Sequence, residues 1–413
     1  MLYRKTNYVV FIIVFYLIIF RDFFVNYISI FGYLDELFAA LAIPVAFCEL
    51  QKKQYKIVIS KQKRESRIVL LILLFSLLGL IGNLYYQYQP FFAAVLPDWF
   101  LNLKFWLSIY VAYILFKNID FQSCGKKISQ HIKIVILLYL ILILLDIIFN
   151  VFPGDYRYGI KSTQLFYRIH TVFAAICAFL LALLTVVKEH TKGYRIYATI
   201  LIVLLVSTLR SKAIGAACLF ILLYYIIYFF NKKIKISHIF MLVLAGILIG
   251  WSQIQYYFFS SISNTAARNV LLRTCIQVAN DHFPFGAGFA TYASYYSGIA
   301  YSTLYEKYGI MNIYGLTRNN PVYVSDSFWP MIIAQTGYIG ALFYILALIV
   351  LFILIQRTTK KYKNLYLASL FALAYLGISS LAESAFVNSF AIPLAIIIGI
   401  SLSSAKERSN YEY

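Results

Sequence analysis

The sequence predicts an all-α polytopic membrane protein with about 12 transmembrane helices, forming a single transmembrane domain over residues 1–413. Hydrophobic residues make up 62% of the chain and charged residues 13%, whereas globular domains are about a quarter charged. Apolar runs of roughly 18 or more residues recur along the chain, and each is long enough to cross a hydrocarbon core of about 30 Å as a helix. The basic residues lie mostly between these runs.

The apolar runs predict twelve spans that place both termini in the cytoplasm. The first run follows Arg4 and Lys5 and precedes Arg21 and Asp22 without a small-residue cleavage site, which indicates an uncleaved span rather than a signal peptide. The predicted spans are residues 7–25, 31–49, 68–86, 99–116, 134–152, 166–187, 196–209, 213–230, 238–258, 328–355, 365–382 and 387–404.

The distribution of positive charge explains the formal net charge of +20. The connections predicted to be cytoplasmic hold 25 of the 36 Lys and Arg residues, and the outer side and the membrane hold the other 11. This bias is the positive-inside pattern of proteins in the cytoplasmic (inner) membrane, so nucleic acid is not needed as a partner. The five cysteines show no CxxC spacing and are interpreted as packing residues.

One long connection, residues 259–327, is predicted on the outer face. It is rich in Tyr, Ser, Asn and Gly, and one helix is predicted within it, from Ala266 to Asn280. A loop of this length between short-looped helices is usually functional. We therefore expect the functional site near this loop.

Basic residues on the outer side run against the topology rule and need another explanation. Arg210 and Lys212 lie at the sharp turn between the seventh and eighth spans. One interpretation is that they snorkel toward lipid phosphates. The other is an anion site for a phosphate-bearing substrate, since the guanidinium fork matches phosphate geometry.

The long loop adds further candidates, namely Arg268, Arg273 and Arg318 as cations and His282 as a polar ligand. Arg268 and Arg273 are five residues apart, about 140° around a helix, so one narrow face cannot present both. Arg268 is favoured as the functional one. The predicted outer proton acceptors are Asp155, Asp281, His282, Glu306, Asp326 and Glu383.

Two of these acceptors have simpler interpretations. Asp326 stands where the loop re-enters the membrane, where an Asp commonly caps a helix. His282 beside Asp281 could be an ordinary loop pair. No metal-ligand spacing, Walker motif, HExxH or GxSxG is present in the sequence, so no metal or cofactor is predicted.

The segment "DSFWPMIIAQTGYIG" resembles the O-antigen polymerase and ligase superfamily. Asp326 and Ser327 precede nine residues and then Gly337 and Gly340. Ligases of this superfamily carry a His, then Asn, Ser or Gln, nine residues and GxxG at the same junction. Asp326 replaces that His here, which favours the Wzy-type polymerases over the ligases.

A second part of the resemblance involves the outer arginines. Arg210 stands at the turn after an apolar span, and Arg268 lies in the outer loop ahead of Pro284, Gly286 and Gly288. The resemblance covers the seventh to tenth spans, and the first half only by hydropathy.

The resemblance implies a GT-C-like membrane glycosyltransferase that joins polyprenyl diphosphate-linked oligosaccharide repeat units at the outer leaflet into O-antigen, capsule or exopolysaccharide. For such a reaction we expect metal-independent inverting transfer, with Arg210, Arg268 and Asp326 as catalytic residues, and Lys212, Arg273, Arg318 and His282 binding substrate. The expected partners are membrane lipid, a chain-length regulator and the flippase of the same pathway. An O-antigen ligase or a lipid-linked oligosaccharide transporter is the alternative.

Overall fold

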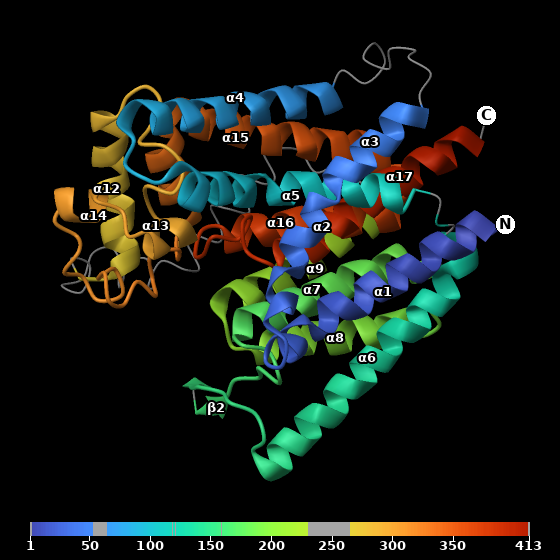
Figure 1. Cartoon of the computed structure of the whole chain (residues 1–413). Helices are drawn as coiled ribbons and strands as arrows, with labels where there is room; N and C mark the ends of the chain where they lie inside the picture. Colours follow the sequence, from blue (N-terminus) through green and yellow to red (C-terminus); the bar gives the residue numbers. More distant parts are fainter. Residues whose placement is uncertain are drawn as a thin grey trace.

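The protein is mostly helical. The computed structural model describes residues 2–52, 64–117, 119, 121–157, 159–229 and 265–411 (Figure 1). The ninth predicted span, residues 238–258, lies outside these described residues. The first half contains α1 (Leu2–Val25), the short helix η1 (Ser29–Tyr33), α2 (Leu34–Ala40), α3 (Ala42–Lys52), α4 (Glu65–Tyr86), the π-helical turn η3 (Phe91–Val95), α5 (Leu96–Leu115) and α6 (Phe121–Phe149).

A two-stranded hairpin separates α6 from the remaining helices. Strands β1 (Tyr156–Arg157) and β2 (Ile160–Lys161) pair antiparallel, with Tyr156 opposite Lys161. The helices that follow are α7 (His170–Val186), η4 (Lys188–His190), α8 (Tyr194–Ser207), α9 (Ser211–Tyr228), α12 (Ala267–Asp281), α13 (Tyr295–Ile299), α14 (Leu304–Lys307), α15 (Phe328–Thr359), α16 (Lys363–Ser379) and α17 (Ala391–Tyr411).

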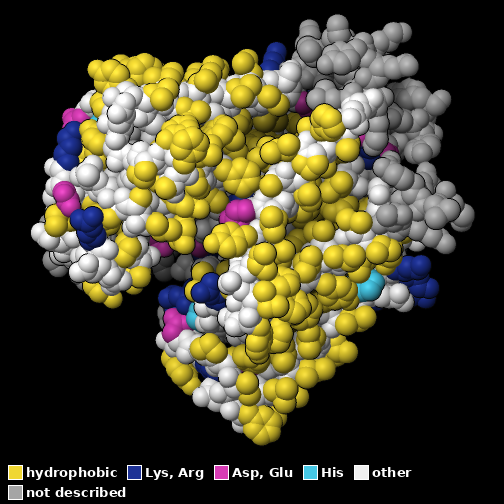
Figure 2. Space-filling model, viewed as in Figure 1, with side chains coloured by type: hydrophobic (Ala, Val, Ile, Leu, Met, Phe, Trp, Pro, Cys, Tyr) yellow, Lys and Arg dark blue, Asp and Glu magenta, His cyan; other side chains and the backbone are white. Residues whose placement is uncertain are grey.

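Several helices have the length and composition of membrane spans, which confirms the predicted class at that level. Among the described residues, six stretches qualify, and α7 and α8 are apolar but shorter. The six are Asn7–Val25, Ser29–Glu49, Glu65–Tyr86, Ser123–Phe149, Ser211–Tyr228 and Phe328–Thr359. The total of 12 spans stays a prediction. Figure 2 shows apolar side chains over most of one face, and charged ones mainly at its margins.

The second predicted span, residues 31–49, is not one continuous helix. It consists of η1, α2 and α3, with a break at Leu41. Pro44 explains the break, because proline lacks an N–H and its ring clashes with the carbonyl four residues earlier, here that of Ala40. The sixth span also differs, since residues 166–169 precede the helix and α7 begins at His170.

The buried centre consists mainly of α7, α16 and α17. Nearly every residue of α7 is buried, as are residues 391–405 of α17, which is expected of helices that are apolar all round. Helix α17 packs on α5, α15 packs on α4, and α16 contacts α7, α9 and α17. In Figure 1 the two chain ends lie at one end of the bundle, and α12, α13 and α14 lie at the other.

An ion-pair network ties α1 to α2 and α5. Lys104 forms ion pairs with Asp35 and with Glu36, the latter at 3.1 Å, and Arg21 pairs with Asp35 at 3.1 Å and with Asp22 at 3.1 Å. The Lys104 side chain is only 2% exposed. Charged side chains at this depth are costly unless they are paired, so the network explains why these residues are tolerated within predicted spans.

Substituting Lys104 with Met should destabilise the protein by about 3–5 kcal/mol, because removal of one partner leaves buried carboxylate charge uncompensated. Thermal unfolding of the purified protein in detergent measures this as a lowered midpoint. The double variant Lys104→Met/Glu36→Gln restores the network's net charge and should recover part of the loss. An unchanged midpoint for Lys104→Met would show that the network does not hold these helices together.

The two segments that carry the family resemblance meet in space. Gly337 interrupts α15 with φ 68° and ψ 179°, and the loop containing Gly286 and Gly288 lies against that break. The Ala287 N–H donates to the Ala334 carbonyl and the Gly288 N–H to the Gln335 carbonyl, both at 2.9 Å. The glycines allow this close approach, because a Cβ on Gly286 would lie 2.3 Å from the Gly337 nitrogen.

The variant Gly286→Ala should therefore lower stability by about 2–5 kcal/mol, since it adds left-handed strain to a backbone clash. Gly286 has φ 78°. The matched control is Gly377→Ala in α16, where an added Cβ meets nothing within 4 Å. That change should be neutral or slightly stabilising. Equal unfolding midpoints for the two variants would contradict the role of the glycine contact.

Candidate functional site

The N-terminus of α9 carries two of the predicted site residues. Arg210 is the N-cap residue, with extended backbone, and Lys212 lies in the first turn. The preceding Leu209 has φ 52°, and this left-handed residue makes the sharp turn between α8 and α9. The start of the helix adds the positive end of its dipole to the two side-chain charges, an arrangement that favours anions.

Arg210 is held by side chains from the loop after α6 and from α7. Its Nη2 donates to Asp155 Oδ1 at 3.1 Å and to His170 Nδ1 at 2.8 Å. A guanidinium only donates, so Nδ1 of His170 accepts, and a neutral His170 carries its proton on Nε2. That nitrogen lies 2.7 Å from Ser162 Oγ and 3.1 Å from Asp155 Oδ1. His170 and Asp155 thus orient the guanidinium.

Asp155 stays ionised in this setting. Its Oδ1 accepts the Ser162 hydroxyl at 2.6 Å and its Oδ2 accepts Arg157 Nε at 3.2 Å. The Ser162 hydrogen bond, with Arg157 and Arg210, holds the pKa of Asp155 well below its usual range. The Asp155 side chain is 45% exposed, so water also solvates it.

Lys212 belongs to a second group of charged residues. It pairs with Glu383, which lies in the connection between α16 and α17, and both side chains are largely buried. Arg268 of α12 pairs at 3.1 Å with Asp326, which lies two residues before the first residue of α15. Burial raises the pKa of Asp326, and the nearby Arg268 and Lys212 oppose that rise. Burial likewise raises the pKa of Glu383, opposed chiefly by Lys212.

The Asp326 side chain does not cap helix α15. The N-cap of α15 is Ser327, and it makes no side-chain capping hydrogen bond. Asp326 Oδ2 accepts Arg268 Nη2 instead. Asp326 joins the loop helix α12 to the start of α15, across 58 residues of sequence.

Both arginines keep a donor unused. Nε of Arg210 and Nε of Arg268 are buried atoms without a hydrogen-bond partner among the residues that the structure describes. A buried unpaired N–H is costly, so such atoms call for an explanation. Each guanidinium is anchored through Nη2, and its Nε is left as a donor that an acceptor such as a phosphate oxygen would satisfy.

Arg210 and Lys212 are two residues apart, so the two groups of charges adjoin at the start of α9. Together they contain four cations, Arg157, Arg210, Lys212 and Arg268, and three carboxylates, which gives a net charge of +1 with His170 neutral. The carboxylates are Asp155, Asp326 and Glu383.

The other predicted binding residues occupy different positions. Arg273 is exposed on α12, and Arg268 is the residue of that helix that pairs with Asp326. Arg318 is exposed, with its guanidinium 5.9 Å from the Tyr301 ring centre. His282 is buried, donates through Nδ1 to the Val278 carbonyl at 2.7 Å and contacts the Tyr88 hydroxyl through Nε2 at 3.0 Å.

His282 is thus a packing residue at the end of α12. A carbonyl only accepts, so Nδ1 carries the proton and Nε2 accepts from the Tyr88 hydroxyl. Its sequence neighbour Asp281 accepts the Tyr308 hydroxyl at 2.7 Å. The expectation that His282 binds substrate has no support from these contacts.

Sequence reasoning missed His170 and Ser162, and it left Asp155 and Glu383 among the unassigned carboxylates. The signal in the sequence was a polar residue close to the end of an apolar helix. His170 is the first residue of α7, and Glu383 lies in the connection before α17. Comparison with protein-family models, curated proteins and solved structures gave no match.

Proposed function

We propose that this protein is a surface polysaccharide polymerase that joins polyprenyl diphosphate-linked oligosaccharide repeat units. The observation that carries the proposal is the set of Arg210, Lys212 and Arg268, with two unused guanidinium Nε donors and a carboxylate beside them. Such a set fits a diphosphate leaving group and an acceptor hydroxyl. The resemblance at Asp326, Gly337 and Gly340 points to the same class of enzyme.

The proposed step is an inverting displacement. An acceptor sugar hydroxyl forms a bond to the anomeric carbon of the donor glycan, while the bond from that carbon to the diphosphate oxygen breaks. The proton passes to Asp326, through the oxygen not bound to Arg268. Arg210, Arg268 and Lys212 stabilise the charge that develops on the diphosphate, and preorganised cations in a partly dry site lower the barrier.

We place this reaction at the outer leaflet of the cytoplasmic membrane. The basic connections predict a cytoplasmic location for both termini. The described ends of the chain lie opposite α12–α14 in the bundle (Figure 1). The site residues adjoin the loop helix α12 and the starts of α9 and α15, so the same assignment puts the site outside. An outer site suits polymerisation of units that have already crossed the membrane.

The experiment is a gel profile of surface polysaccharide from a strain that lacks the gene. We expect loss of the polymer ladder with single repeats remaining, and rescue by the wild-type gene. Long chains that accumulate on the carrier lipid would instead indicate a ligase. An intact ladder would reject the polymerase.

A further inference from the structure

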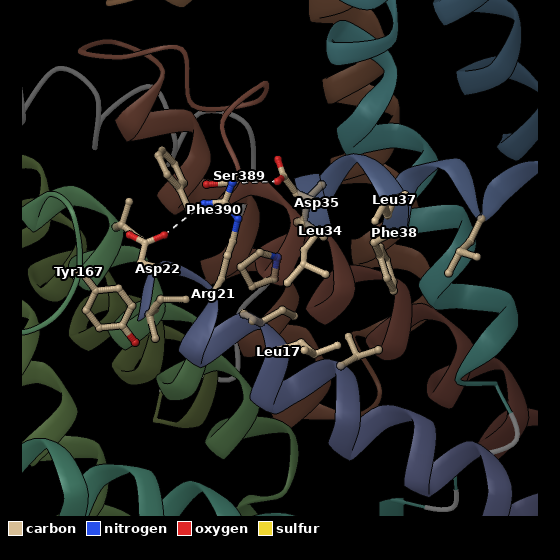
Figure 3. A pocket seen from close by; sticks show the side chains of 17 residues that line it. Leu17, Arg21, Asp22, Leu34, Asp35, Leu37, Phe38, Tyr167, Ser389 and Phe390 are labelled. Carbon is tan, nitrogen blue, oxygen red and sulfur yellow. Dashed lines mark hydrogen bonds and ion pairs between the residues drawn. The ribbon is translucent and has the colours of Figure 1, made fainter. Parts of the chain in front are cut away.

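A cavity of about 280 Å³ lies between α1, α2, α7 and the start of α17. Its lining is mostly apolar, including Leu17, Leu37, Phe38 and Phe390 (Figure 3). Leu37 is 53% exposed and Leu41, also in the lining, is 42% exposed. The cavity therefore reaches the apolar surface, which faces lipid in a membrane protein.

Two elements connect this cavity to the candidate site. On α7, His170 contacts Arg210, and Val172, two residues later, lines the cavity. In the connection between α16 and α17, Glu383 pairs with Lys212, and Ser389 lines the cavity. The cavity and the cation site thus lie at the same end of the bundle, on neighbouring parts of the same two elements.

The charges at the cavity argue against a phosphate there. Arg21 lines it between Asp22 and Asp35, and Figure 3 shows these three side chains together. With Lys104 and Glu36 the network has two cations and three carboxylates, a net charge of −1. A diphosphate is therefore favoured at the positive cluster around Arg210, and the cavity favours hydrocarbon.

We propose that this cavity holds part of the polyprenyl chain of the lipid-linked substrate whose diphosphate lies at Arg210, Lys212 and Arg268. The inference rests on the proposed function for the identity of the lipid. A volume of about 280 Å³ is at the lower limit of small-ligand pockets, so it takes only a segment of the chain. The rest of the chain lies in the bilayer.

The test uses the purified full-length protein in lipid nanodiscs and a polyprenyl diphosphate that carries a photoreactive diazirine on its tail. We expect labelling of peptides containing Leu37 or Val172. Unlabelled polyprenyl diphosphate should compete, and the same concentration of phosphatidylglycerol should not. Leu37→Trp fills the cavity mouth from an exposed position and should reduce labelling about tenfold, equivalent to about two buried methylene groups.

The matched control is Ile43→Trp, an exposed position on α3 outside the cavity lining, which should label like wild type. Equal competition by phosphatidylglycerol would show an ordinary phospholipid site and overturn the proposal, as would unchanged labelling of Leu37→Trp. The probe carries no sugar, so its labelling is independent of glycosyl transfer. Labelling here without polymer formation rejects the polymerase alone, and polymer formation with labelling elsewhere rejects the cavity assignment alone.

Discussion

Alanine at Arg210 or at Arg268 should reduce chain elongation about 10²–10³-fold while the protein remains in the membrane. This is the usual loss when one preorganised donor to a developing negative charge is removed. The paired carboxylates, Asp155 and Asp326, are 45% and 42% exposed, so water can solvate them when the arginine is lost. We therefore expect lost activity rather than lost folding. The readout is the polysaccharide ladder, with membrane abundance measured by immunoblot.

The control for these variants is Arg195→Ala, which removes an exposed cation from the first turn of α8, at the opposite end of that helix from Arg210. It should leave the ladder unchanged. Arg268→Lys keeps the charge but loses the guanidinium fork, so partial activity is expected. Full-length ladders from both alanine variants, at normal abundance, would remove these residues from the mechanism.

Asparagine at Asp326 should reduce elongation by about 10²–10⁴-fold, the range for loss of a general base. The control is Asp281→Asn, which changes a carboxylate at the end of α12 that accepts the Tyr308 hydroxyl and should stay near wild type. Elongation by membranes from each strain, followed over time, gives the rates. Equal rates for the two variants would exclude Asp326 as the base.

The pH dependence of elongation follows from the same assignment. A base acts when deprotonated, and burial raises the pKa of Asp326, so the rate should fall with decreasing pH at values above the ordinary aspartate pKa of about 4. Lys212 lowers that pKa. The variant Lys212→Met removes this cation while Glu383 stays in place, and its acidic limb should move to higher pH. A limb that stays in place would contradict the assignment.

Local sequence patterns predicted the parts of the fold that depend on local interactions. The loop helix was predicted at Ala266 to Asn280 and is observed at Ala267–Asp281. The break at Leu41 could have been predicted from Pro44, but the long apolar run concealed it. The start of α7 at His170 could not, because Leu165 takes a left-handed conformation that its residue type disfavours.

The pairings within the site depend on tertiary packing and therefore lay beyond the sequence. Arg210, Arg268 and Asp326 were identified as candidates because charged residues beside apolar spans are energetically costly and usually serve a function. Their partners come from distant elements, as with Asp155 for Arg210, 55 residues away. No local periodicity encodes which loop carboxylate meets which guanidinium. The same reason applies to Asp35 and Lys104, separated by 69 residues.

The most direct test of the central claim is polymerisation by the purified protein in proteoliposomes supplied with polyprenyl diphosphate-linked repeat units from its own strain. We predict a ladder of polymer with release of polyprenyl diphosphate, formed by the wild type without any other protein and lost in Arg210→Ala. Repeat units that remain single in the presence of folded wild-type protein, or that only cross the bilayer, would contradict the account.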